Sequence, residues 1–69
     1  MKNINFEVND LVKYSEPTNE SELHRRFIVV EVYQANDVKP LTLVVRDAND
    51  NSRLPSTNSF SAIHYTKVN

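Results

Sequence analysis

The chain of 69 residues contains no glycine and no cysteine. Without cysteine it can form no disulfide, no thiolate metal site and no thiol nucleophile. Without glycine it lacks the glycine-rich loops that cradle phosphate groups in P-loop and dinucleotide-binding proteins. Composition alone therefore excludes activities that depend on those motifs.

The missing glycine also restricts the turns, because tight turns often need a residue with positive φ. Asparagine and aspartate tolerate this conformation best among the remaining residues. We therefore expect the turns at three clusters of these residues, which are Asn9-Asp10, Asn36-Asp37 and residues 49–51.

Long apolar segments and an excess of charge are missing as well. The longest wholly apolar run, residues 27–30, is far too short to span a bilayer, which needs about 20 residues. The first residues show no apolar core of a secretory signal, so we expect a cytoplasmic protein that does not contact a membrane. The chain has eight Lys and Arg and nine Asp and Glu. It therefore lacks the basic excess that is typical of nucleic-acid-binding proteins.

What the chain does contain is typical of one small folded domain. Hydrophobic residues make up 39% of the sequence and charged residues 25%. Short runs rich in β-branched and aromatic residues alternate with polar segments. They predict strands at residues 11–14, 27–33, 41–46 and 63–68, with a short edge strand between 52 and 60. Asn19 and Glu22 have the spacing of a helix cap, which predicts one or two helical turns in the segment that follows the first strand.

Alternation along the strands predicts which side chains face the core. In the second strand Ile28, Val30 and Val32 share a wholly apolar face, which we expect to point inward. The full predicted core is Val12, Ile28, Val30, Val32, Leu43, Val45 and Ile63.

Residues 8–14, Val-Asn-Asp-Leu-Val-Lys-Tyr, resemble the entry strand V-G-D-x-V-x-Y of small bacterial-type SH3-like β-barrels. A long loop at 15–26, two central strands, a polar hairpin and a short turn before a closing strand follow, although Asn9 stands where the pattern prefers glycine. The resemblance implies an all-β fold, with residues 1–69 forming one SH3-like barrel of about five short antiparallel strands. Together with the cap spacing at Asn19, it predicts single helical turns in the 15–26 loop and near 59–62. It implies no function, because barrels of this type serve many partners.

Two segments resemble metal sites in part. Glu20, Glu22 and His24 alternate, but we interpret them as a solvated charged face. Residues 47–51 begin like a calcium loop, yet the sixth and twelfth positions lack the required glycine and glutamate. Neither histidine belongs to a nucleophile–base motif. We therefore expect no catalytic residue, no cofactor and no metal site.

These features favour a small non-catalytic binding or accessory module whose partner is a protein segment. Long loops on small barrels often carry binding, and arginine bonds carboxylate or phosphate in two places. The expected contact residues are Tyr14, Arg25, Arg26 and Tyr33. The alternative is a nucleic-acid-binding module that combines aromatic stacking with the basic residues Lys13, Arg25, Arg26, Arg46 and Arg53.

Overall fold

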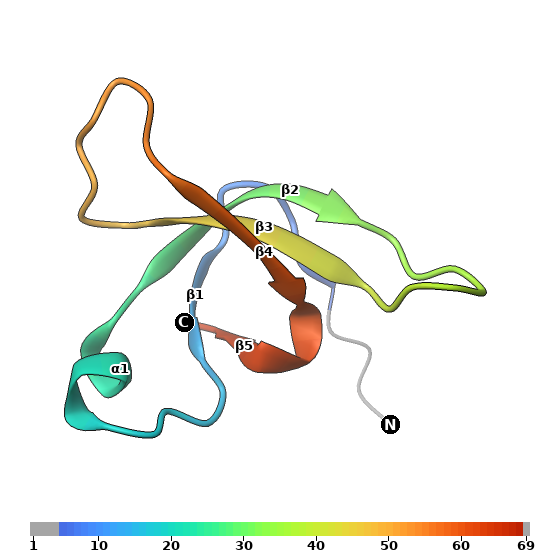
Figure 1. The fold of residues 1–69 in the computed structure, drawn as a ribbon, viewed down its shortest axis with the longest axis horizontal. Helices are drawn as coiled ribbons and strands as arrows, with labels where there is room; N and C mark the ends of the chain where they lie inside the picture. Colours follow the sequence, from blue (N-terminus) through green and yellow to red (C-terminus); the bar gives the residue numbers. More distant parts are fainter. Residues whose placement is uncertain (1–4, 69) are drawn as a thin grey trace.

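The computed structural model describes residues 5–68, which form one antiparallel sheet of five strands with little helix (Figure 1). The strands are β1 (Leu11–Tyr14), β2 (Phe27–Tyr33), β3 (Thr42–Asp47), β4 (Thr57–Ser61) and β5 (Tyr65–Lys67). A single helical segment, α1 (Glu20–His24), precedes β2, and a 3₁₀ turn, η1 (Ala62–His64), joins β4 to β5. The predictions of an all-β domain and of both helical turns are confirmed. No helix within residues 5–68 has the length and apolar character needed to cross a membrane.

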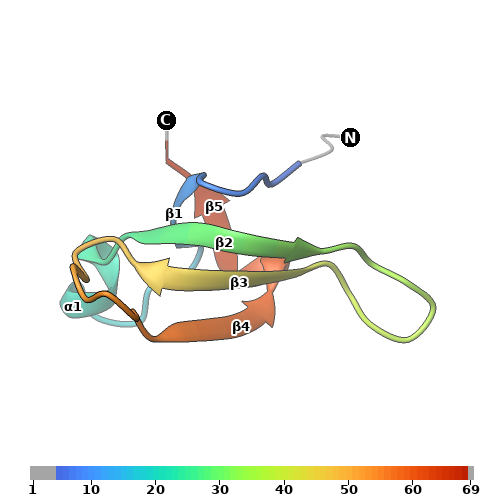
Figure 2. The same ribbon diagram turned by 90° about the horizontal axis from the view of Figure 1, so that it is seen from above.

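The sheet is not closed into a barrel, so the predicted closure is wrong. Its strand order is β4-β3-β2-β1-β5, which places β4 and β5 at opposite ends. Figure 2 shows β1 and β5 crossing the direction of β2, β3 and β4, so the sheet is strongly bent. β5 has three residues, all paired with β1, and within the described chain no ladder joins it to β4.

The turns of this glycine-free chain form in two ways. Asn9 has a φ of 80°, and it is the one residue between 5 and 68 with positive φ. The prediction is therefore confirmed at the first cluster. At the second cluster the Asn36 side-chain oxygen accepts hydrogen bonds from the backbone N–H groups two and three residues further on, at 2.8 and 2.9 Å. Asp50 accepts a similar bond from Ser52 at 2.9 Å, so these two turns form by side-chain bonding instead of positive φ.

The start of α1 forms as its sequence predicts. Asn19 is the N-cap, and its side-chain oxygen accepts a hydrogen bond from the Glu22 N–H at 2.8 Å. This bond satisfies one of the backbone donors that a helix leaves unpaired at its first turn. The cap fixes the first turn of α1, to which Glu22 belongs.

The core lies on one side of the bent sheet. Its buried hydrophobic residues are Phe6, Val12, Phe27, Val29, Leu43, Val45, Ala62 and Tyr65. Val12, Leu43 and Val45 are fully buried, as predicted.

A β-bulge in β2 changes the expected alternation. The register with β3 shifts between Val29 and Glu31, so Val30 is an extra residue in this strand. Phe27 and Val29 are buried before the bulge, and Val32 packs against the core after it. The bulge therefore reverses the inward and outward positions along the strand.

Three predicted core positions are corrected by this geometry. Ile28 and Val30 are half-buried instead of buried, because Phe27 and Val29 take the inward positions before the bulge. Ile63 is 78% exposed, because it lies in η1, where Ala62 is the buried residue.

Candidate binding site

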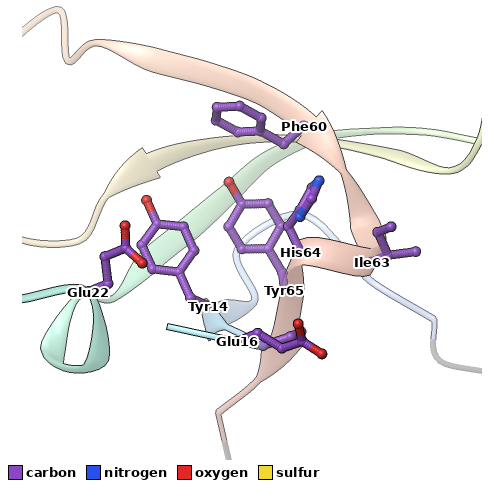
Figure 3. Close-up of a pocket in the computed structure, with 8 residues that line it drawn as sticks. Tyr14, Glu16, Glu22, Phe60, Ile63, His64 and Tyr65 are labelled. Carbon is purple, nitrogen blue, oxygen red and sulfur yellow. The ribbon is translucent and has the colours of Figure 1, made fainter. Parts of the chain in front are cut away.

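One pocket is lined by both ends of the open sheet (Figure 3). It has a volume of about 520 Å³, and we call it the aromatic pocket. Its lining residues are Tyr14, Ser15, Glu16, Glu22, Phe60, Ile63, His64 and Tyr65. Phe60 comes from β4, Tyr65 from β5 and Tyr14 from the end of β1, so the fold brings together residues far apart in the sequence.

The base of the aromatic pocket is part of the core. The register of β1 and β5 sets Tyr14 opposite Tyr65, and the two rings stack with centroids 6.0 Å apart and planes 17° apart. Phe27 meets both rings edge-on, with its centroid 5.1 Å from that of Tyr14 and 5.9 Å from that of Tyr65. Tyr65 is buried, so this base is held in place by packing.

The wall of the pocket is accessible. Phe60 is 46% exposed, and its ring centroid lies 6.5 Å from that of Tyr65 and 6.3 Å from that of His64. Exposed Ile63 continues the same apolar surface. Aromatic rings at such a site offer a large contact area that partners can bury.

The charged groups that line the pocket are carboxylates. Glu16 and Glu22 are in the lining set, which contains no lysine or arginine. The Thr18 backbone N–H and hydroxyl both donate to Oε1 of Glu22, each at 2.9 Å. The bond from the backbone N–H is the main reason that the pKa of Glu22 lies below its ordinary value, and the hydroxyl bond adds to it. Glu22 therefore carries a negative charge at neutral pH.

The phenol of Tyr65 stays neutral. Burial raises its pKa to about 12, and the nearby Tyr14 acts in the same direction. The base of the pocket thus adds aromatic surface without adding charge.

The serine hydroxyl that lines the pocket has a structural partner. Oγ of Ser15 lies 2.8 Å from Oγ1 of Thr66 on the neighbouring strand, in hydrogen-bonding contact. Within residues 5–68 no three His, Asp or Glu side chains gather as a potential metal site.

The rings of Tyr14, Phe27, Phe60 and Tyr65 contact one another, and we call them the aromatic cluster. Two predicted contact residues lie at or beside it. Tyr14 lines the pocket. Arg25 lies next to it, with Cζ 5.0 Å from the centroid of Phe27 and Nη2 2.8 Å from Oδ2 of Asp47. The bond to Asp47 raises the pKa of Arg25, so its charge is already paired within the chain.

The other two predicted contact residues lie in different surroundings. Nη1 of Arg26 donates to the backbone carbonyls of Leu23 and Arg25, at 3.1 and 3.0 Å. Tyr33 lines a separate pocket of about 410 Å³, and its hydroxyl donates to Oε2 of Glu31 at 2.7 Å, which raises the pKa of the phenol. The four residues do not line one pocket, and their binding role stays a prediction.

Sequence reasoning did not select Phe60 or His64, and within the 15–26 loop it selected Arg25 and Arg26 instead of Glu22. Phe60 stands in a polar segment, and it meets His64 only because η1 turns the chain. The capping pattern located Glu22 but gave no sign that it faces Tyr14. Comparison of the chain with protein-family models, with curated proteins and with solved structures finds no match.

Proposed function

We propose that the chain is a small non-catalytic binding module whose aromatic pocket holds a segment of a partner protein. The observation that carries this proposal is the accessible aromatic wall on a rigid base. Phe60 and Ile63 are exposed, while the Tyr65 ring beneath them is fixed in the core. Concave, mostly apolar surfaces with a few polar groups are typical binding sites.

The neighbouring strand supports an extended segment as the ligand. β4 is an end strand of the sheet, and its first four residues, Thr57 to Phe60, are exposed. One edge of β4 carries no partner strand within residues 5–68, which leaves backbone N–H and C=O groups for pairing. An added peptide strand can use such an edge while it places a side chain in an adjacent pocket.

The charges favour protein over nucleic acid. Glu16 and Glu22 line the pocket and repel phosphate groups. Of the basic residues in the nucleic-acid alternative, Arg25 is paired with Asp47, and Arg26 donates to backbone carbonyls. Both contacts reduce what these arginines can offer to a phosphate backbone.

A relation to SH3-like domains belongs to the same proposal. It is supported by the order of the elements, in which a long loop and α1 precede the central strands β2 and β3, and the short turn η1 precedes β5. The entry segment, residues 8–14, carries the sequence pattern that suggests this relation. Binding modules of many kinds use such small sheets, so the pocket and not the fold defines the function.

Peptide selection tests the proposal. Peptides selected from a random displayed library against the full chain should bind the wild type and a Leu54→Ala variant equally. They should bind Phe60→Ala at least tenfold more weakly. Leu54 is 91% exposed and does not line the aromatic pocket, so it is a matched control. Backbone amide spectra of the variants show whether each is folded.

Two results would contradict the proposal. Selected peptides that bind Phe60→Ala as tightly as the wild type would place the binding surface elsewhere. A selection that yields no peptide, together with salt-dependent binding of a ten-residue oligothymidylate, would favour the nucleic-acid alternative.

A further inference from the structure

We infer that the aromatic pocket receives a positively charged side chain of the bound segment, either an ammonium or a guanidinium group. This inference rests on the proposed function and specifies the chemistry of the partner. It combines three observations. Carboxylates line the pocket, aromatic rings line it as well, and the adjoining ring of Phe27 already contacts the guanidinium of Arg25.

The carboxylates are placed to receive a cation. Both hydrogen bonds from Thr18 end on Oε1 of Glu22, which leaves Oε2 without a hydrogen bond from residues 5–68. In Figure 3 the Glu22 carboxylate lies beside the Tyr14 ring, and Glu16 lies below the pair of tyrosines. The lining set contains no lysine or arginine, and Arg25 beside the pocket acts on Glu22 only through its charge, without a hydrogen bond. A ligand cation would supply the missing partner and bind with a charge-assisted hydrogen bond.

The rings strengthen this preference. Aromatic faces attract cations that lie within about 6 Å of the ring centroid. Tyr14 and the exposed Phe60 both line the pocket, where a ligand cation can approach their rings. Tyr14 and Phe60 are accessible enough for a ligand to reach them.

The aromatic cluster already binds one cation from its own chain. The guanidinium of Arg25 lies over Phe27, with Cζ 5.0 Å from the ring centroid, and it forms an ion pair with the carboxylate of Asp47. A ring face and a carboxylate thus hold a guanidinium on one side of the cluster. The pocket repeats this combination with Tyr14 and Glu22, and its lining set contains no lysine or arginine.

Other segments fit this pocket less well. An acidic or phosphorylated side chain would face Glu16 and Glu22. A wholly apolar side chain would cover the carboxylate of Glu22 without giving it a partner, which is unfavourable for a charged group. A cationic side chain avoids both costs, and its apolar stem can pack on Phe60.

Four short peptides of serine and glycine test the inference in titrations followed by backbone amide spectra. Their central residue is arginine, its neutral counterpart citrulline, lysine, or its neutral counterpart norleucine. We expect at least one cationic peptide to shift the amide signals of the pocket and to bind at least tenfold more tightly than its neutral counterpart. A Glu22→Gln variant should reduce this ratio at least threefold, because glutamine keeps the acceptor for Thr18 but loses the charge. Glu20→Gln should leave the ratio unchanged, because Glu20 is exposed on the same helix and does not line the pocket.

The outcomes separate this inference from the function on which it rests. Neutral and cationic peptides that bind the pocket with equal Kd, or a ratio that Glu20→Gln lowers as much as Glu22→Gln does, would overturn the inference. The module could then still bind the library-selected peptides through Phe60, and the proposed function would stand. If none of the four peptides and none of the selected peptides shifts the signals of the pocket, both the inference and the proposed function fail.

Discussion

Val29 and Val30 are adjacent and chemically identical, yet replacing each with alanine should have very different effects. Val29 is fully buried opposite Val45, whereas Val30 is the extra, half-buried residue of the bulge. Removing two buried methyl groups costs about 1.6 kcal/mol in transfer free energy. The cavity left behind adds to this, so we expect Val29→Ala to lower the free energy of unfolding by about 2–3 kcal/mol.

That loss is large for a domain of this size. At about 0.05–0.15 kcal/mol per residue, a chain of this length has a free energy of unfolding of about 3–10 kcal/mol. Since 1 kcal/mol shifts the Tm of a domain this small by about 4–8 °C, Val29→Ala should lower the Tm by about 10–20 °C. Val30→Ala should cost less than about 1 kcal/mol, because its side chain is already partly in water.

Circular dichroism during heating and during urea titration measures both variants against the wild type. Urea titration gives the free energy of unfolding, and a constant m-value shows that the comparison concerns stability alone. Equal losses for the two variants, or a larger loss for Val30→Ala, would refute the bulge and the assignment of the inward face of β2.

Three further predictions concern single contacts, and urea titration measures each of them. Arg25→Ala should lower the free energy of unfolding by about 1 kcal/mol, because it removes an ion pair and a cation–ring contact, whereas Arg53→Ala should have little effect; equal losses would contradict this. Asn9→Ala should cost about 1–2 kcal/mol, because alanine tolerates positive φ poorly, and Asn9→Gly should cost almost nothing; a harmless alanine would show that the turn is not strained. Hydrogen bonding, chiefly to a backbone N–H, lowers the pKa of both Asp47 and Asp10 in the folded chain. Their contribution to stability is therefore present above the ordinary aspartate value of 3.8 and is lost as the pH falls through the lowered values. Asp47→Asn should weaken this acid dependence, and an unchanged slope would contradict its assignment to Asp47.

The strands were predictable where the chemistry of each short segment decides its structure. Alternation located Val12, Leu43 and Val45 in the core, because no irregularity interrupts β1 or β3 near them. The cap at Asn19 was predictable for the same reason, since its acceptor and its donor are three residues apart.

The features that the sequence did not reveal depend on contacts between distant segments. The bulge at Val30 is a property of the pairing between β2 and β3, and two adjacent valines give no local sign of it. The aromatic pocket depends on η1, which brings Phe60 beside Tyr65. Tyr14 and Tyr33 are similar in sequence, since each ends a strand, but only Tyr14 faces the ring of Tyr65. Pattern analysis could therefore locate aromatic residues but not decide which of them meet.

The bulge also affects how this chain tolerates a change of length. Deletion of either Val29 or Val30 leaves the same sequence, in which Phe27, the remaining valine and Val32 fall on alternate positions and Glu31 lies between the last two. A strand of that composition pairs regularly with β3, with its three apolar side chains inward and its carboxylate in water. In most strands the loss of one residue turns every following side chain to the opposite face. Here the loss of one valine would remove the bulge and straighten the strand, and the inner and outer sides of the protein would stay the same.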